Sequence, residues 1–434
     1  MRIAVVGAGV GGLATGVRLA AAGHRVTVHE QAAAPGGKCG LVEAGGFRWD
    51  SGPSLVTMPW VLRDLLGDAV ELLRVEPVTR YRFPDGSEVE LSADLPRALE
   101  ALEAWSPRAG QDWMRFLGVC AGMWQASVPF LTGPPPWPPR PMRRGDPRPD
   151  PRDLLRVKPW HTLRTLARAT IRDPRLRLVV ERFATYAGAD PRRAPAALAV
   201  AGYVEHAFGA WHPRGGVYEI VRALVRRLEA AGGELCLGER VEDVRALGAD
   251  AVVDSRDAGG RGERSLSGFA LMLGLRGRTP GLAHHTITFP RDYDAEFDDV
   301  FVRRRPVADP TIYVSVPEVT EGGERESWFV LVNAPAAPAH DWDAYGERLL
   351  ARLGLGDRVL ARAQRSPADL ERETGAIGGA IYGRAPHGRL GTLRRPGQRG
   401  PDGVWRVGGT VHPGGGLPLV MLGAATVARA IGPA

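Results

Sequence analysis

Cysteine is scarce in this sequence. Cys39, Cys120 and Cys236 are the only cysteines in 434 residues, and no C-x-x-C pair occurs. We therefore expect neither a disulfide framework nor a metal site, and a reducing compartment fits this composition.

Long apolar runs are also missing. No stretch of 18 consecutive apolar residues occurs, so no membrane-spanning helix is expected, although a protein that lies on a membrane surface is compatible with this. An apolar segment begins at residue 2, which leaves no room for a signal peptide, and we expect a cytoplasmic protein.

Lysine is nearly absent. Lys38 and Lys158 are the only two, so arginine makes up nearly all of the 56 basic residues, and the formal net charge is +7. Two interpretations stay open: a compositional bias of the coding sequence, which also gives 56 glycines and 36 prolines, and attraction to an anionic membrane surface. No basic segment has the interleaved aromatic residues of a nucleic-acid module, so no nucleic-acid partner is expected.

The first thirty residues carry a strong pattern. Residues Arg2 to Val6 predict a strand, the segment 7–12 has G-x-G-x-x-G spacing, and a helix is predicted over 13–22. A second strand, 25–29, ends at Glu30. The glycines permit a tight turn, the helix N-terminus offers N–H groups to a pyrophosphate, and the acid can bind ribose hydroxyls. The sequence therefore predicts a dinucleotide site.

A second glycine pair, Gly36 and Gly37, follows the predicted ribose-binding acid. One helix N-terminus is enough for one pyrophosphate, so a second backbone loop indicates a larger cofactor and favours FAD over NAD. An ordinary turn is the alternative for this pair, and a strand-to-turn junction is the alternative for Gly52 and Pro53.

The C-terminus carries another signal. A strand beginning at Val404 runs into the glycine-rich segment 408–416, and a helix is predicted over 417–431. Such a unit would return to the first sheet and aim a second positive helix end at the cofactor, where it stabilises negative charge on a reduced flavin. A simple C-terminal α/β unit is the alternative.

The middle of the chain predicts further elements. We expect helices over 60–75, 95–117 (broken near Pro107), 154–183 (divided at Pro174), 217–231 and 342–353, a hairpin over 79–91, and strands over 234–237, 249–253, 269–275, 311–316 and 328–332. Residues 133–151 are rich in proline and predict an exposed, semi-rigid loop. The basic segment 154–183, with Trp160 and Arg164, predicts either an ordinary surface or a membrane-contacting face.

Several motifs occur together along the chain. They lie at residues 7–12, 35–38, 50–59, 182–191, 203–211, 215–218, 282–287, 292–301 and 412–418. On these residues the chain resembles the bacterial carotenoid desaturases of the phytoene desaturase type, within the amine-oxidase-like FAD superfamily. The His-Pro-Gly-Gly-Gly and Glu-Phe-Asp-Asp segments are specific to that family, and the N-terminal glycines are not.

The resemblance implies an α/β fold with three parts. A Rossmann-like FAD-binding domain would comprise residues 1–94, 215–265 and 386–434. A discontinuous α+β substrate domain would have its sheet in 266–385, and a helical lobe that sits on membranes would span 95–214. A long hydrophobic tunnel would lead to the flavin.

The resemblance also implies the cofactor contacts. FAD is expected to contact Gly7, Ala8, Gly9, Val10, Gly11, Gly12, Glu30, Gly36, Gly37, Lys38, Gly52, Pro53, Ser54, Val241, Gly408, Gly409, Gly416, Leu417 and Pro418. Two features depart from the family. Lys38 stands where arginine is frequent and lacks its bidentate fork, and residues 242–265 are short, which suggests a trimmed flavin domain.

The implied reaction is the desaturation of a carotenoid or related isoprenoid, in which an allylic carbon loses hydride to flavin N5 and a proton leaves. A proton acceptor is therefore needed, and Glu205, His206, Asp298 and Asp299 are the candidates. A structural histidine, and aspartates that cap a helix or form salt bridges, are the alternatives. Oxygen or a membrane quinone would reoxidise the flavin.

Other functions stay open. The same pattern suits an FAD oxidase or isomerase acting on another isoprenoid or natural-product scaffold, including a 3,4-desaturase of hydroxylated carotenoids. A prenyl-lipid-binding protein without flavin is the non-enzymatic alternative. The intact phosphate turn, Glu30 and the C-terminal loop argue against it, because a lipid carrier does not need them.

Overall fold

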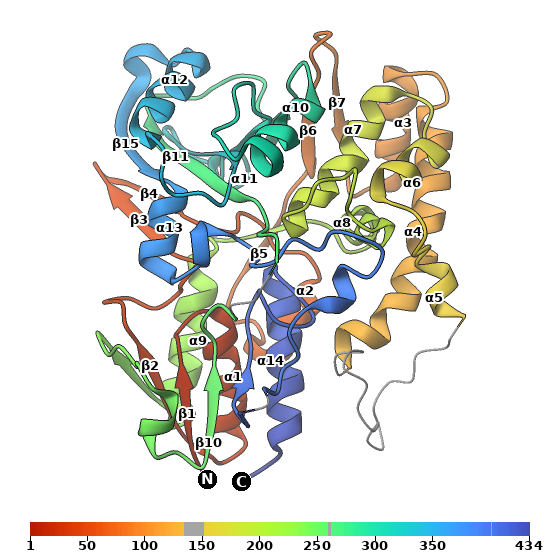
Figure 1. Ribbon diagram of the computed structural model, residues 1–434. Helices are drawn as coiled ribbons and strands as arrows, with labels where there is room; N and C mark the ends of the chain where they lie inside the picture. The colour runs from red at the N-terminus through yellow and green to blue at the C-terminus, as the bar shows by residue number, and fades with distance from the viewer. Residues whose placement is uncertain (134–151, 259–261, 401) are drawn as a thin grey trace.

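The computed structural model describes residues 1–133, 152–258, 262–400 and 402–434. Two large β-sheets, two two-stranded sheets and a helical lobe make up the described part of the chain, and the two termini lie close together beside the first large sheet (Figure 1). One of the small sheets pairs β3 (Leu41–Ala44) with β4 (Phe47–Asp50). The proline-rich loop predicted over 133–151 lies, except for Gly133, outside the described residues.

The first sheet is parallel throughout and contains the N-terminal motif. Its strands lie in the order β16 (Trp405–Arg406), β10 (Ala251–Asp254), β1 (Arg2–Val6), β2 (Arg25–Glu30) and β9 (Glu234–Leu237). Helices α1 (Val10–Ala21), α9 (Tyr218–Ala230) and α14 (Leu417–Ile431) share one apolar core with it. Gly16 allows the close approach of α1, since a Cβ there would lie 3.2 Å from the Val28 side chain.

The second sheet is mostly antiparallel and has seven strands. They lie in the order β15 (Val359–Arg365), β11 (Ser267–Leu275), β14 (Glu326–Ala334), β13 (Ile312–Ser315), β12 (His285–Thr288), β6 (Thr79–Arg82) and β7 (Glu88–Leu91). Only β6 and β12 pair in parallel. Helix α12 (Trp342–Leu353) shares one apolar cluster with this sheet, and a second cluster joins the sheet to the helical lobe.

The helical lobe stands beside the second sheet (Figure 1). It comprises α3 (Leu95–Trp105), α4 (Ala109–Thr132), α5 (Asp153–Arg156), α6 (Leu163–Thr170), α7 (Pro174–Arg182) and α8 (Val200–Phe208). Asp94 and Asp173 cap α3 and α7 through their side chains, which explains why the chain turns into helix at these points. The break expected at Pro174 is confirmed, because this proline occupies the first turn of α7.

Two predictions need correction. The helix predicted over 60–75 is wrong in its second half: α2 (Pro59–Leu66) ends at Gly67, and β5 (Leu72–Arg74) then pairs with β8 (Trp211–Pro213). Gly67 adopts φ 58°, which ends the helix.

The second correction concerns the hairpin of β6 and β7. The hairpin forms as predicted, but it extends the second sheet, so these strands do not belong with the FAD-binding segment 1–94. The reason is the parallel pairing of β6 with β12, a contact between segments about 200 residues apart that the local pattern does not encode.

Candidate functional site

Glu30 holds the turn between β1 and α1 from inside. Its buried carboxylate accepts hydrogen bonds from the N–H groups of Ala8, at 2.7 Å, and Ala32, at 2.9 Å. A carboxylate has about four acceptor positions, so Glu30 keeps capacity for ribose hydroxyls.

The glycines of this turn bring backbone against backbone. A Cβ at Gly12 would lie 2.0 Å from the carbonyl oxygen of Gly7, so no side chain fits there. Gly9 is the N-cap of α1, and no side chain caps this helix. The N–H groups of its first turn, residues 10–12, are therefore available to a phosphate.

The second glycine pair lies beside the first turn. The N–H of Gly36 donates to the carbonyl of Ala8 at 2.9 Å, and a Cβ at Gly37 would lie 3.5 Å from the Cα of Gly9. Gly36 and Gly37 both adopt positive φ, 125° and 58°. The two loops thus form one backbone surface, as a single extended cofactor requires.

The C-terminal loop reaches the same place. A Cβ at Gly11 would lie 3.2 Å from the Cα of Gly408. Gly416 is the N-cap of α14 and no side chain caps that helix, so Leu417 and Pro418 begin a second uncapped positive helix end. The predicted return of the C-terminus to the first sheet is confirmed.

Gly52 to Ser54 lead from this surface to the second sheet. A Cβ at Gly52 would lie 1.9 Å from the carbonyl oxygen of Lys38, which explains the glycine. The Ser54 hydroxyl shares a short hydrogen bond with the Tyr313 hydroxyl of β13.

Two predicted cofactor residues have protein partners. The Lys38 ammonium group lies 2.8 Å from the Asp257 carboxylate and donates to the Ile381 carbonyl at 2.9 Å. Lys38 therefore ties the loop after β2 to a loop after the second sheet, and its contact with a phosphate stays a prediction. The Val241 carbonyl accepts from Arg256 at 2.9 Å.

Arg395 is a site residue that the sequence did not single out. Its guanidinium donates to the Gly409 carbonyl at 3.2 Å and lies close to Gly414, and no carboxylate of the described residues pairs with it. Loss of hydration lowers its pKa to about 10, against a smaller opposing effect of Tyr382. A desolvated cation without a counterion is costly, so its place in this loop indicates an anionic ligand.

Glu205 is buried on α8, with 8% of its surface exposed. Desolvation raises its pKa to about 7, against the lowering effects of a hydrogen bond from Tyr186 and the charge of Arg182. The buried Arg182 guanidinium lies over the rings of Tyr186, at 5.9 Å, and Tyr313, at 5.7 Å. Glu205 thus belongs to a polar cluster that continues through Tyr313 to Ser54.

The other three candidates for the proton acceptor are engaged elsewhere. The His206 Nε2 accepts from the Trp113 indole N–H at 2.8 Å, and desolvation lowers the pKa of His206 to about 4. Asp298 pairs with Arg192 at 2.8 Å. Asp299 accepts from two arginines at 2.8 and 2.9 Å, which help to lower its pKa against desolvation. Each of them has a structural partner, and only Glu205 lies in the cluster that leads to Ser54.

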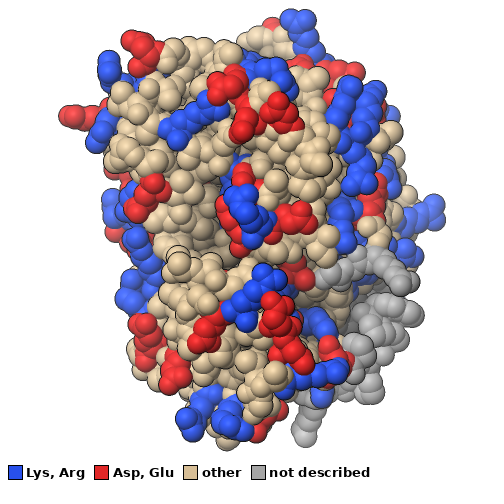
Figure 2. Space-filling model, turned by 60° about the vertical axis from the view of Figure 1, so that its left-hand side comes forward, with Lys and Arg blue, Asp and Glu red and all other residues tan. Residues whose placement is uncertain are grey.

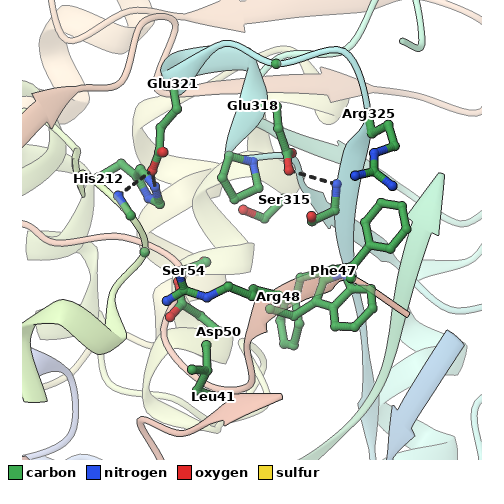
Figure 3. Close-up of a pocket in the computed structure, with 18 of the residues that line it drawn as sticks. Leu41, Phe47, Arg48, Asp50, Ser54, His212, Ser315, Glu318, Glu321 and Arg325 are labelled. Carbon is green, nitrogen blue, oxygen red and sulfur yellow. Dashed lines mark hydrogen bonds and ion pairs between the residues drawn. The ribbon is translucent and has the colours of Figure 1, made fainter. Parts of the chain in front are cut away.

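A cavity of about 370 Å³ opens next to Ser54 (Figure 3). Its wall is aromatic on one side, at Phe47 and Trp49. On the other side the His212 Nε2 lies 2.6 Å from the Glu321 carboxylate, and these two residues face Phe47 across the opening. The cavity is amphipathic and could admit a substrate that is partly polar.

Three buried histidines connect this cavity to the cluster around Glu205. The ring centroids of His212 and His284 are 4.8 Å apart, those of His284 and His285 4.4 Å, and His285 stacks on Tyr313 at 5.8 Å. His212 and His284 each have one ring nitrogen without a hydrogen-bond partner among the described residues, whereas His285 interacts with the backbone of Val78 and Ser54. The Nε atom of Arg182 lacks one as well. A buried unpaired polar atom costs about 1–3 kcal/mol, so a water molecule or a polar group of a ligand would be stabilised at these atoms.

Comparison with known proteins agrees with this geometry. The family model for flavin containing amine oxidoreductase matches residues 10–263. Hydroxyneurosporene desaturase of Rubrivivax gelatinosus is 33% identical, over 97% of this chain and 91% of that protein. The zeta-carotene-forming phytoene desaturase of Myxococcus xanthus is 30% identical, over 98% and 93%. Cyclohexylamine oxidase of Brevibacterium oxydans has a similar fold, with a TM-score of 0.61, 14% identity and 99% coverage of both chains.

The described residues fit FAD. Helices α1 and α14 begin without a side-chain cap, and glycine loops adjoin them. Arg395 adds a cation that has no carboxylate partner among the described residues. Together these features suit a long, anionic cofactor that lies against the backbone. FAD is therefore the cofactor, and the chain is an oxidoreductase.

Arg395 gives a direct test of this assignment. We expect Arg395→Met to weaken FAD binding at least tenfold, since it removes the cation that faces the anionic ligand. The protein is first freed of its cofactor. Titration with FAD, followed by flavin fluorescence, then measures the affinity for FAD. Arg394→Gln is the matched control, because this neighbouring arginine is exposed and should leave FAD affinity unchanged. Equal affinity of the Arg395 variant and the native chain would contradict this role.

Proposed function

The chain belongs to the flavin-containing amine oxidoreductase family, and we propose that it desaturates a carotenoid or a related isoprenoid. The observation that carries this proposal is the position of Glu205, a buried carboxyl group with a pKa of about 7 in the polar cluster that ends at Ser54. The names of the relatives supply the substrate class.

Desaturation removes a hydride and a proton from adjacent carbons. FAD, when bound, supplies the hydride acceptor. The carboxylate of Glu205 takes the proton, and its raised pKa makes it a competent base near neutral pH. Tyr186 and Arg182 hold the carboxylate in place through a hydrogen bond and a nearby positive charge. Burial excludes water from the reacting carbons.

The polar lining favours a substrate with a hydroxyl group near the reacting bond. A hydrocarbon end would cover the unpaired Nε–H group of Arg182 without compensation, whereas the oxygen of a hydroxyl group could accept a hydrogen bond from it. The relatives include both a phytoene desaturase and a hydroxyneurosporene desaturase. We therefore place the substrate of this chain with the hydroxylated group.

The membrane-contacting face predicted over 154–183 stays a proposal, centred on Trp160 and without Arg164. Arg164 forms ion pairs with Glu181, at 2.6 Å, and Asp294, and its side chain is only 13% exposed, so it is not available to a membrane surface. Trp160 and Leu390 are 52% and 46% exposed, and they line a shallow cavity together with Pro159, Gly388, Arg389 and Arg394.

Apolar side chains next to arginines suit an anionic membrane surface. Leu155, which is 61% exposed, precedes Trp160 by five residues. Charges of both signs are mixed over most of the face in Figure 2, while basic side chains gather along its right edge. No helix in the described ranges is long and apolar enough to span a bilayer, so this contact would be peripheral. Oxygen or a quinone stays the predicted electron acceptor.

The role of Glu205 has a distinct pH signature. We expect Glu205→Gln to lower kcat by about 100-fold or more. In the native enzyme kcat/KM should rise with pH up to about 7 and then level off, because protonated Glu205 cannot accept a proton. The hydrogen bond from Tyr186 lowers the pKa of Glu205. Tyr186→Phe removes it, so the pH at which kcat/KM levels off should move to a higher value.

Asp298→Asn is the control and should keep the pH profile, since Asp298 pairs with Arg192 away from the cluster. Steady-state rates with carotenoid in liposomes, at fixed FAD content, give the comparison. Full activity of the Glu205 variant would remove Glu205 from the mechanism, and a loaded enzyme inert toward every carotenoid would reject desaturation.

The substrate preference can be measured separately. We expect kcat/KM for an acyclic carotenoid with a terminal hydroxyl group to exceed that of the same hydrocarbon at least tenfold, because one unpaired buried polar atom costs about 1–3 kcal/mol. Product analysis by chromatography of parallel liposome assays gives the ratio. A preference for the hydrocarbon would refute the hydroxyl assignment and still support desaturation.

The membrane face is tested by vesicle sedimentation. We expect the double variant Trp160→Ser, Leu390→Ser to lose binding to anionic vesicles at least tenfold, since burying each apolar side chain contributes about 1.5–3 kcal/mol. The control is Val302→Ser with Leu360→Ser, which replaces residues of 72% and 44% exposure elsewhere. Equal losses in both variants would argue against a specific face.

A further inference from the structure

A second cluster of chemically reactive side chains lies on the first sheet, away from the cluster around Glu205. His29 of β2 and Cys236 of β9 occupy directly paired positions on neighbouring parallel strands. Glu239 follows β9, and its N–H donates to the Glu30 carbonyl at 2.8 Å. The three residues therefore meet at the edge of the sheet, next to the acid that is expected to bind ribose.

These side chains leave the sheet on the face opposite to the helices. Val28 points into the core shared with α1 and α9, and since side chains alternate along a strand, His29 points the other way. The connection over 242–248 that follows holds only a short 3-10 turn, Val244–Leu247. The cluster is accessible, with side-chain exposures of 16% for His29 and 54% for Glu239.

The geometry is close to that of a metal site. One ligand atom from each of His29, Cys236 and Glu239 lies within 4.8 Å of the other two, and the His29 Nδ1 is 2.7 Å from a Glu239 oxygen. Tetrahedral zinc with bonds of about 2.0–2.3 Å places its ligands roughly 3.3–3.8 Å apart. Displacements of about 1 Å, which lengthen the contact between His29 and Glu239, would bring the three donor atoms to that spacing, with a water as fourth ligand.

The donor set selects the kind of cation. One thiolate, one imidazole and one carboxylate form a borderline-soft set that suits zinc and does not suit magnesium or calcium. The negative charges of Glu239 and Glu234 act on the Cys236 thiol. The same negative potential attracts a divalent cation, which then stabilises the thiolate.

We propose that His29, Cys236 and Glu239 bind a zinc ion that ties β9 to β2 beside Glu30. Strand β9 lies at the edge of the sheet and pairs only with β2, through four residues on each strand. A zinc ion across this pair binds the folded state alone and therefore stabilises the edge next to the cofactor site. The sequence contains no metal-binding motif for this site, because the proposed ligands come from segments far apart in the chain.

The first test is zinc binding to the FAD-loaded protein by titration calorimetry. We expect one zinc per chain, with affinity lowered at least tenfold in Cys236→Ser, His29→Gln and Glu239→Gln. Glu239 is exposed, so its variant should fold even if the others do not. Glu242→Gln is the matched control, because Glu242 is a neighbouring exposed carboxylate that pairs with Arg240 at 2.7 Å. Magnesium chloride should show no binding at this site.

A second readout locates the metal at the thiol. Cys39 and Cys120 are buried, so iodoacetamide should label Cys236 first, as peptide mass spectrometry can show. Zinc should slow this labelling at least tenfold in the native chain and not in Glu239→Gln. Absence of saturable zinc binding, equal affinity of the Cys236 variant, or labelling that zinc leaves unchanged would each overturn the proposal. None of these outcomes depends on carotenoid turnover.

Discussion

The structure depends on the close approach of bare backbone at the N-terminus of α1. A Cβ added at Gly12 would lie only 2.0 Å from the carbonyl oxygen of Gly7. A Cβ added at Gly52 would lie 1.9 Å from the carbonyl oxygen of Lys38. A side chain at either position would separate loops that must meet. Since these loops present N–H groups and helix ends to the cofactor, the binding surface exists only while the glycines keep the backbones together.

The charges between the first large sheet and the second large sheet follow from that packing. Lys38 is neutralised by Asp257, and the Ser54 hydroxyl bonds to Tyr313 across the same seam. Arg395 has no carboxylate partner among the described residues, so an anionic ligand at this loop would compensate its charge. The protein thus balances its own charges at the seam and leaves one cation for the cofactor.

The polar interior sets the chemistry of the second half of the site. Arg182, Glu205 and the histidines beside Tyr313 are costly to bury in a protein that binds an apolar polyene. The free-energy cost of burying these groups is explained if they perform proton transfer and recognise an oxygen atom on the substrate. Such groups discriminate between substrates more sharply than an apolar wall does, because an unmatched partner leaves them unpaired.

The sequence by itself determined the strand, turn and helix at residues 2–21, the acid at Glu30, and the C-terminal helix that begins at Leu417, because these patterns are local and every part lies within a few residues of the next. Tertiary structure alone decided that Glu205 is the candidate base whose cluster leads to Ser54, since burial and the approach of Arg182 set its pKa. Parallel pairing likewise brought His29 to Cys236 across some two hundred residues of chain. Long-range packing creates such neighbours, and no local spacing records them.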